Sequence, residues 1–326
     1  MVTLCGLANI GATCYLNTLV QCLWSSVLFR KKMHDLQSLP PTKPLSIVKE
    51  LMSIFQMFDE QRAYVVIRPE RLVFFMQKVF DYLNIRSQND IYEIYTLLVQ
   101  RICDETLISV DNMIHAPING PRNFEKIAHR CNKAWSKYFE KEYSQCTDLC
   151  YGQQISQIVC GHCKHIHINY QPFAVWEVPL PREGDIALED AFSNSMLPET
   201  LTEWKCSECK MTSPSERTIK LWKFPQLFVV CLKRFQHVNG VLVKNNVHVD
   251  IPQVIEMFPL NLAASSEKGV TYTLRSLAVH HGDLHYGHYY AMVSNGDKWF
   301  RVDDDVVQTS PFNDRFAYMC FFERQT

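Results

Sequence analysis

Cys14 occupies the position in this sequence that most strongly indicates nucleophilic chemistry. The segment 6–17 reads Gly-Leu-Ala-Asn-Ile-Gly-Ala-Thr-Cys-Tyr-Leu-Asn, so a short loop with two glycines precedes a predicted helix that begins at Cys14. The orphan N–H groups and positive dipole end of a helix N-terminus stabilise a thiolate. Asn9 can turn its side-chain amide toward the same point and, with the Cys14 backbone N–H, bind a developing oxyanion. The alternative, a buried structural cysteine, fits Cys22 on the same helix.

A predicted β-hairpin near the C-terminus supplies candidates for the base and for the group that orients it. Two β-like runs, 288–294 and 297–305, flank the dipeptide Asn295-Gly296. Asn-Gly between such runs is the strongest short signal for a two-residue hairpin turn. Such a turn would fix which residues face each other along both strands.

His288 and Asp303 face each other in this predicted register. If Ser294 pairs with Asp297, then His288 lies directly opposite Asp303, with Cβ atoms about 4.5–5.5 Å apart. The Asp303 carboxylate would accept the Nδ1–H of the imidazole, whereas Asp304 points to the other face of the sheet. We therefore predict that Asp303 orients His288.

Together these residues predict cysteine-protease chemistry that needs no metal. His288 would hold Cys14 as a thiolate and later protonate the leaving amine. Four other histidines are weaker candidates for the base, because loop histidines are expected to be exposed or to shape the loop. They are His248, His280, His281 and His285.

Two Cys-x-x-Cys pairs predict a separate site for a structural zinc ion. Four thiolates give closed tetrahedral coordination, which is typical of structural zinc. The gap between the pairs exceeds that of a compact zinc ribbon, so we expect two knuckles that cap two β-hairpins. The alternatives are four free cysteines, or His162 or His165 in place of one of them. The four predicted ligands are Cys160, Cys163, Cys206 and Cys209.

The composition indicates a folded, soluble, intracellular protein. Of 326 residues, 47% are hydrophobic and 21% charged, and the formal net charge of -1 offers no general field for nucleic acid or for a membrane surface. No apolar run approaches the roughly 18 residues of a membrane helix, and the N-terminus does not resemble a secretory signal. Thirteen cysteines without such a signal favour reduced, metal-bound or catalytic thiols over disulfides. We expect a cytoplasmic or nuclear location.

The elements that must position these residues predict an α+β fold. Up to about residue 150 the apolar spacing is helical, and later runs are rich in β-forming residues bounded by Gly, Pro and Asn. Loops are expected at 119–121 and 263–269. The clearest helical segments are 16–23 and 92–105, and the clearest β segments are 155–159, 227–235, 272–279 and 289–293.

These segments resemble the ubiquitin-specific proteases, a family of papain-like cysteine deubiquitinases. The segment 6–17 carries every fixed position of that family's nucleophile box, Gly-Leu-x-Asn-x-Gly-x-Thr-Cys-Tyr-Leu-Asn. Residues 279–283 (Val-His-His-Gly-Asp), 287–289 (Gly-His-Tyr) and 299–303 (Trp-Phe-Arg-Val-Asp) resemble its base and aspartate segments, with Val302 in place of the usual Phe. The segments 224–235 and 317–322 also match, so the resemblance spans nearly the whole chain.

The resemblance implies a single catalytic domain over residues 1–326. Its thumb would cover about 1–150, and its palm and zinc-bearing fingers about 151–326. The segments 236–246 and 281–287 would overhang the channel for the substrate tail. Since we see no accessory domain in the sequence, we expect the catalytic surface or partners to choose targets.

The resemblance also implies further site residues. Asp304 would assist the oxyanion. Segment 88–94, Gln-Asn-Asp-Ile-Tyr-Glu-Ile, resembles the family's Gln-Gln-Asp-Ala-x-Glu-Phe box, with departures at Asn89 and at both Ile positions. Asp90 and Glu93 would then contact the substrate. A helix N-terminus, with Asp90 and Glu93 as a capping box, is equally consistent.

The implied function is a thiol-dependent deubiquitinase that cleaves the peptide or isopeptide bond after the C-terminal Gly of ubiquitin. The expected partners are ubiquitin and ubiquitinated proteins, bound by a monomer, with no nucleic acid and no membrane. Alternatives are a protease for a ubiquitin-like modifier ending in Gly-Gly and a catalytically weak ubiquitin-binding module. Acyl transfer by the same three residues is more remote.

Overall fold

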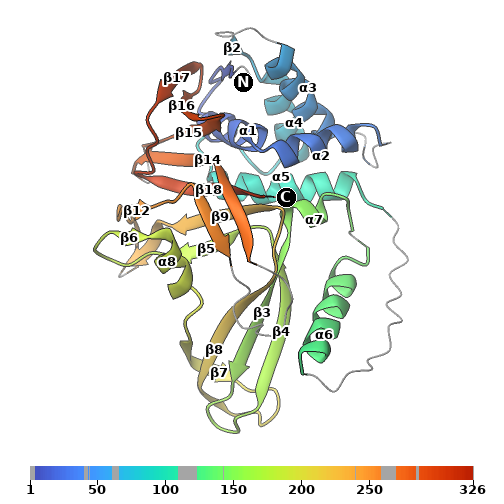
Figure 1. The fold of residues 1–326 in the computed structure, drawn as a ribbon, viewed down its shortest axis with the longest axis vertical. Helices are drawn as coiled ribbons and strands as arrows, with labels where there is room; N and C mark the ends of the chain where they lie inside the picture. Colours follow the sequence, from blue (N-terminus) through green and yellow to red (C-terminus); the bar gives the residue numbers. More distant parts are fainter. Residues whose placement is uncertain are drawn as a thin grey trace.

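Helices fill the first part of the chain and strands the rest, as predicted for an α+β fold (Figure 1). The structure, a computed structural model, describes residues 4–39, 43, 45–60, 66–108, 123–141, 143–238, 240–257, 269–283 and 286–325. Some predictions fall outside these residues. They are the loop at 119–121, the loop at 263–269 except Gly269, and the position of His285.

Seven helices precede the main sheets within the described ranges, and an eighth follows later. They are α1 (Cys14–Ser25), α2 (Val27–Gln37), α3 (Ile47–Glu60), α4 (Glu70–Val79), α5 (Ile91–Glu105), α6 (Asn123–Tyr138), α7 (Thr147–Cys150) and α8 (Leu188–Asn194). Helices α1 to α5 gather at one end of the molecule, and α6 lies apart from them (Figure 1). The α1–α5 group corresponds to the expected thumb.

Helix α1 is buried on every side, although its apolar spacing suggests a helix with one polar face. Helices cover it on one side and the main sheet on the other. Its polar side chains are therefore buried as well, and they bond to the preceding segment. Gln21 Nε2 donates to the Cys5 carbonyl at 2.7 Å, and Asn17 Nδ2 donates to the Leu7 carbonyl at 3.1 Å.

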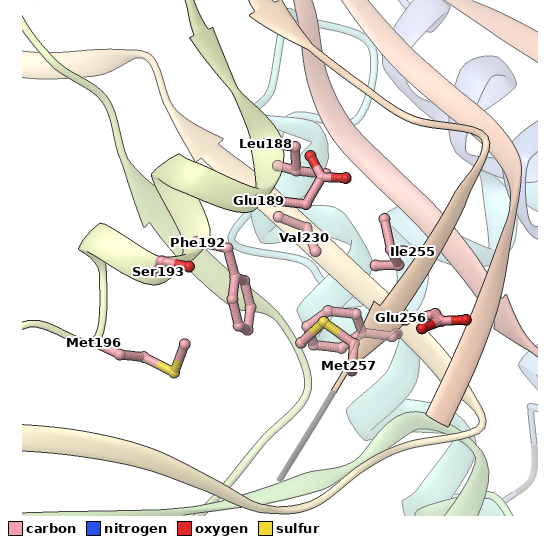
Figure 2. Close-up of a pocket in the computed structure, with 10 residues that line it drawn as sticks. Leu188, Glu189, Phe192, Ser193, Met196, Val230, Ile255, Glu256 and Met257 are labelled. Carbon is pink, nitrogen blue, oxygen red and sulfur yellow. The ribbon is translucent and has the colours of Figure 1, made fainter. Parts of the chain in front are cut away.

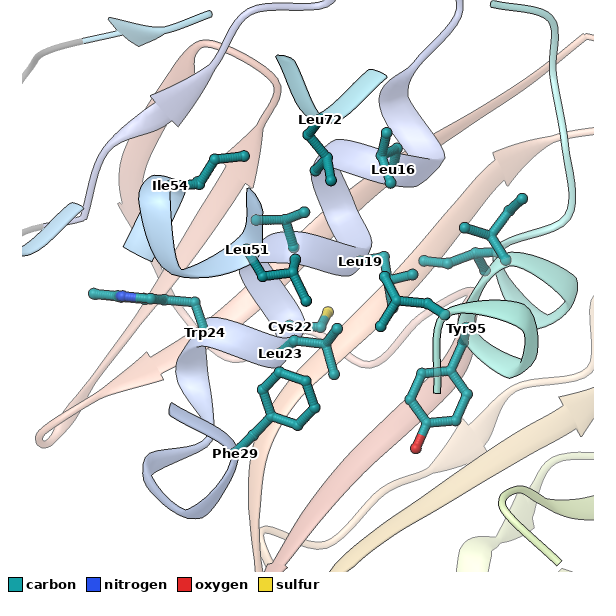
Figure 3. Packing of buried hydrophobic residues seen from close by; sticks show 14 of the residues in the cluster. Leu16, Leu19, Cys22, Leu23, Trp24, Phe29, Leu51, Ile54, Leu72 and Tyr95 are labelled. Carbon is teal, nitrogen blue, oxygen red and sulfur yellow. The ribbon is translucent and has the colours of Figure 1, made fainter. Parts of the chain in front are cut away.

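The apolar residues of α1 form the centre of the thumb core (Figure 3). Leu19 and Leu23 are fully buried, together with Phe29 of α2, Leu51 of α3 and Tyr95 of α5. Burying a side chain of this size contributes about 1.5–3 kcal/mol of transfer free energy. This packing holds the N-terminus of α1, and with it Cys14, in a defined place.

An eight-stranded sheet forms the palm, and α1 packs on its strands β14 and β15. The strand order is β17-β16-β15-β14-β18-β9-β5, and β13 also pairs with β14. All neighbours are antiparallel except β5 and β9. The strands are β5 (Trp176–Pro179), β9 (Leu227–Lys233), β13 (Val254–Met257), β14 (Val270–Gly282), β15 (Gly287–Asn295), β16 (Lys298–Asp303), β17 (Val306–Ser310) and β18 (Ala317–Arg324).

A four-stranded antiparallel sheet extends from the palm as the fingers (Figure 1). Its order is β4-β3-β8-β7, from β3 (Gly152–Val159), β4 (Ile166–Phe173), β7 (Glu199–Lys205) and β8 (Thr212–Lys223). The turns of the β3–β4 and β7–β8 hairpins contain the two Cys-x-x-Cys pairs. The predicted placement of the knuckles at two hairpin tips is confirmed.

Three short pairings complete the described fold. The strands are β1 (Gly6–Leu7), β2 (Val66–Ile67), β6 (Ile186–Ala187), β10 (Phe235–Val238), β11 (Val241–Lys244) and β12 (Val249–Asp250). β1 pairs with β2, β10 with β11, and β12 with β6. Within the described ranges, none of the helices is long and apolar enough to cross a membrane.

Candidate active site

Cys14 is the first residue of α1 and is 4% exposed. The loop before it needs unusual backbone conformations, with φ of +118° at Gly11 and +49° at Ala12. The Asn9 side chain closes this loop, since its Oδ1 accepts hydrogen bonds from the Thr13 N–H at 3.0 Å and the Gly11 N–H at 3.3 Å. The thiol therefore lies where the predicted helix start places it.

The β15–β16 hairpin has a different register from the predicted one. Ser294 pairs with Trp299 and not with Asp297, and Gly296-Asp297 form the turn. The prediction is wrong because Gly296, with φ +66°, is the first residue of the turn and not the second. The shift in pairing is two residues, and side chains alternate with a period of two, so each residue keeps its predicted face.

His288 and Asp303 are in contact across this hairpin, as diagonal and not directly opposite neighbours. Nε2 of His288 lies 2.5 Å from Oδ1 of Asp303. The prediction of an Nδ1 contact is therefore wrong, and Nδ1 is left for Cys14. Hydrogen bonds with Asp303 and then with Cys14 raise the pKa of His288 to about 10, although burial lowers it.

Arg301 holds the other oxygen of the Asp303 carboxylate. Its Nη2 donates to Asp303 Oδ2 at 2.6 Å, and its guanidinium lies 4.2 Å from the centre of the Tyr290 ring. The bond with His288 lowers the pKa of Asp303, and Arg301 adds to that effect. The sequence prediction missed Arg301, although residues two apart on one strand share a face.

Asp304 links the loop before Cys14 to the end of β16. It adopts a left-handed conformation with φ +50°, and its backbone carbonyl accepts the Leu7 N–H at 2.8 Å. Its carboxylate accepts one bond from Asn9 Nδ2 at 2.9 Å and one from Asn17 Nδ2 at 2.8 Å. An amide carries two N–H donors, so Asn9 retains a second one for an oxyanion. Asn17 is a contact that the prediction did not include.

A cleft of about 250 Å³ opens beside Cys14 between thumb and palm. Phe235 and Leu242 of the β10–β11 hairpin contribute to its wall, as does Asp283 directly after β14, which is where the overhanging segments are expected. Its lining includes Cys14, Tyr15, Gln88, Asn89, Asp90, Phe235, Leu242, His280, Asp283, Gly287 and Tyr289.

His280 departs from the predicted loop position. It belongs to β14, is 5% exposed, and packs against the rings of Phe235 and Tyr289. Burial lowers its pKa to about 4, so the ring is neutral near pH 7. A neutral buried histidine cannot replace His288 as the partner of a thiolate.

The family profile described as "Ubiquitin carboxyl-terminal hydrolase" matches residues 5–322. The chain belongs to this family. Two relatives within it are ubiquitin carboxyl-terminal hydrolase 5 of Saccharomyces cerevisiae, 25% identical over 98% of this chain, and ubiquitin carboxyl-terminal hydrolase 21 of Bos taurus, 27% identical over 93%. The chain spans 44% and 58% of the lengths of these two relatives.

Solved structures of a SAGA DUB module show the same fold as this chain. One matching chain comes from the SAGA DUB module with Ubp8, bound to ubiquitin aldehyde. The match covers 99% of this chain and 70% of that chain, with a TM-score of 0.70 and 20% identity. The corresponding module bound to monoubiquitin gives a TM-score of 0.73, also at 20% identity, over 99% of this chain and 69% of its own. The predicted papain-like arrangement of thumb, palm and fingers is confirmed.

Asp90 caps helix α5 at the wall of the cleft. Its Oδ1 accepts the Tyr92 N–H at 2.9 Å, and its Oδ2 accepts the Tyr318 hydroxyl at 2.8 Å. Burial raises the pKa of Asp90, and these two bonds oppose the shift. Glu93 lies exposed in the first turn of α5. The capping interpretation of Asp90 is confirmed, and Tyr318 is a partner that the prediction missed.

The four predicted zinc ligands come together at the tip of the fingers. Their sulfur atoms all lie within 4.8 Å of one another. The Cys160 and Cys209 sulfurs are 3.9 Å apart, and those of Cys163 and Cys206 are 3.8 Å apart. This family member therefore has a four-thiol cluster at the turns of the β3–β4 and β7–β8 hairpins, and in Figure 1 these turns lie at the opposite end of the molecule from helices α1 to α5.

A second cavity of about 150 Å³ lies between α8 and the palm sheet (Figure 2). Phe192 and Met196 line one side, and Ile255 and Met257 line the other. Of the described residues around it, none is a cysteine or a histidine. Among the described residues this cavity therefore offers no thiol and no imidazole, and the cleft beside Cys14 remains the candidate active site.

Proposed function

We propose that this chain is a thiol-dependent deubiquitinase whose single catalytic domain cleaves the bond after the C-terminal Gly of ubiquitin. The supporting observation is the placement of a thiol at a helix N-terminus, beside a histidine bonded to an aspartate, at a cleft in a member of this family. Ubiquitin with an electrophile at its C-terminus tests the proposal, because it should couple to Cys14.

In the proposed reaction, Cys14, His288 and Asp303 transfer the ubiquitin acyl group first to the thiol and then to water. The Cys14 thiolate attacks the carbonyl of the ubiquitin terminus, and protonated His288 gives its proton to the leaving amine. Neutral His288 then takes a proton from water, which attacks the thioester and releases ubiquitin and the thiol. Asp303 stays ionised throughout, because Arg301 and His288 both stabilise its carboxylate.

The proposed oxyanion site combines the Cys14 backbone N–H with the Asn9 amide, and Asp304 positions that amide. We predict that Asn9→Ala lowers turnover about 10²–10³-fold with little change in ubiquitin binding, since one preformed donor to the developing charge is lost. Steady-state hydrolysis of a fluorogenic ubiquitin substrate measures this. Unchanged turnover would remove Asn9 from the mechanism.

The substrate proposed for the cleft is the extended C-terminal tail of ubiquitin, free or on a conjugated protein. Two related structures are described as bound to monoubiquitin and ubiquitin aldehyde, which supports this choice. Asp90 is proposed to hold the cleft wall through its Tyr318 bond, and Glu93 to face the substrate from α5. We propose an intracellular monomer that acts on ubiquitinated proteins.

We propose that the four-thiol cluster binds one structural zinc ion. Ligand atoms about 2.3 Å from a tetrahedral zinc ion are separated by about 3.8 Å. The sulfur separations of 3.8 and 3.9 Å in the two pairs described above fit this geometry. Four thiolates leave no open position, so the ion would stabilise the fingers and take no part in hydrolysis.

Metal analysis of protein purified without chelator should return one zinc per chain. Cys206→Ser should loosen the fingers and weaken ubiquitin binding, because thiolate ligation is coupled to local folding. The reaction of Cys14 with a small alkylating agent should change less. Equal loss of both would show that the metal supports the whole fold, and absence of zinc from the wild type would refute the site.

A further inference from the structure

His167 on β4 contacts one of the four clustered thiols. Its Nε2 lies 3.4 Å from Cys206 Sγ, and its Nδ1 lies 3.4 Å from the Ser207 hydroxyl. The imidazole also packs edge to face against the rings of Trp204 and His165, with centroids 4.7 and 4.6 Å away. The ring is thus held between two polar contacts and two aromatic ones.

The two knuckles share the same backbone pattern. In each, the N–H four residues after the first cysteine donates to that cysteine's carbonyl at 3.0 Å, from Lys164 to Cys160 and from Lys210 to Cys206. Both lysines have a positive φ, of 60° and 63°. The fingers tip is therefore a pseudo-symmetric pair of turns.

This pseudo-symmetry makes Ser213 the counterpart of His167. Each follows the second cysteine of its knuckle by four residues, and each reaches the first cysteine of the other knuckle. Ser213 Oγ lies 3.9 Å from Cys160 Sγ, a longer contact than the 3.4 Å from His167 to Cys206. The two positions differ in the strength of the donor that they bring to a thiol.

We propose that His167 is a positioning residue for the metal site, whose Nε2–H donates a hydrogen bond to the Cys206 thiolate. The Nδ1 then accepts from Ser207, which selects this tautomer. The inference rests on the zinc proposed above. His167 does not join the four sulfurs that lie within 4.8 Å of one another, so it supports a ligand and does not replace one.

The proposed bond has a defined consequence for the metal. A donor to a ligand orients that ligand, and loss of such a contact typically weakens metal binding about 10–100-fold. Cys206 also accepts the Glu208 N–H at 3.4 Å, so in His167→Phe the thiolate keeps one of these two donors. We therefore expect an effect at the lower end of that range, so zinc should leave His167→Phe about tenfold faster than it leaves the wild-type chain.

The test compares zinc transfer to a colorimetric chelator from the full chain and from three variants. His167→Phe removes the donor but keeps a ring against Trp204, and His167→Gln restores a donor. Ser213→Ala is the matched control. Release should be fastest from His167→Phe, intermediate from His167→Gln and close to wild type from Ser213→Ala, while ubiquitin-probe labelling verifies that each variant is folded.

Replacing zinc with cobalt provides a spectroscopic readout, and this spectrum would not change in His167→Phe if His167 only stabilised the fold. Without the hydrogen bond the thiolate donates more strongly, so the sulfur-to-cobalt band of His167→Phe should move to longer wavelength with its tetrahedral bands retained. Unchanged release and spectrum in His167→Phe would overturn the proposal, and so would loss of the tetrahedral bands, which would make His167 a ligand. A wild-type chain without zinc would instead refute the four-cysteine site.

Discussion

Cys14→Ala is expected to abolish both hydrolysis of ubiquitin substrates and labelling by an electrophilic ubiquitin probe. Alanine removes the only atom that the proposed mechanism uses to form the acyl intermediate. Helix α1 should remain folded, because this substitution removes one sulfur at its first turn. Gel-shift labelling and fluorogenic hydrolysis measure the two losses, and circular dichroism verifies the fold.

Cys22→Ala is the matched control on the same helix. Cys22 is fully buried two turns further along α1, and burial raises the pKa of its thiol to about 12. It should therefore be inert, and Cys22→Ala should keep full labelling. Probe adducts that persist in Cys14→Ala and map to Cys22 or Cys5 would contradict the assignment of the nucleophile.

Asp303→Ala is expected to lower turnover about 10²–10⁴-fold with little change in ubiquitin binding. The Nε2 of His288 loses its carboxylate partner, so the ring is no longer held in the orientation and tautomer that serve Cys14. Hydrolysis rates measured against a range of ubiquitin substrate concentrations separate kcat from KM. Turnover near the wild-type value would show that Asp303 does not orient the base.

The pH dependence of kcat/KM should move with the same substitution. Asp303 and Cys14 raise the pKa of His288 to about 10, so the protonated ring needed for proton donation persists well above pH 7. Without Asp303 this pKa falls toward its ordinary value of about 6.5, and the alkaline limb should shift to lower pH. Arg301→Gln should not move the alkaline limb to lower pH, because it removes a cation and leaves the Asp303 carboxylate on His288. An unmoved alkaline limb in Asp303→Ala would contradict this electrostatic role.

Local signals predicted the parts of the site that depend on short stretches of chain. The loop with two glycines before Cys14 predicts that a helix starts at Cys14, because glycine readily adopts the positive φ values that such a loop needs. The spacing of Cys160 and Cys163, repeated at Cys206 and Cys209, predicts two similar turns. In both cases the determining interactions lie within about ten residues, which is why sequence alone is sufficient.

The hairpin shows where a local rule gives the right face but the wrong partner. Asn295-Gly296 predicts a turn, yet Gly296 takes the first turn position and the pairing shifts by two residues. Asp303 remains on the His288 side because faces repeat every two residues. The choice of Nε2 over Nδ1 depends on where Cys14 lies, and that is set by the packing of α1 on β15.

Contacts between distant segments could not be predicted from sequence. Asp304 bonds to Asn17 and Asn9 across almost the full length of the chain, and Asp90 bonds to Tyr318 between thumb and palm. His280 is buried because β14 extends further than its apolar pattern indicates. Each of these depends on how the thumb helices pack against the palm, which no short motif encodes.

The most direct test of the proposed function is intact-mass and peptide-mapping analysis of the wild-type chain after reaction with a panel of electrophilic probes. The panel pairs ubiquitin with ubiquitin-like modifiers that end in Gly-Gly. We predict one ubiquitin per chain, attached to Cys14, with slower or no coupling of the other modifiers. Coupling of a ubiquitin-like probe in preference to ubiquitin, or attachment at any other cysteine, would contradict the proposed deubiquitinase.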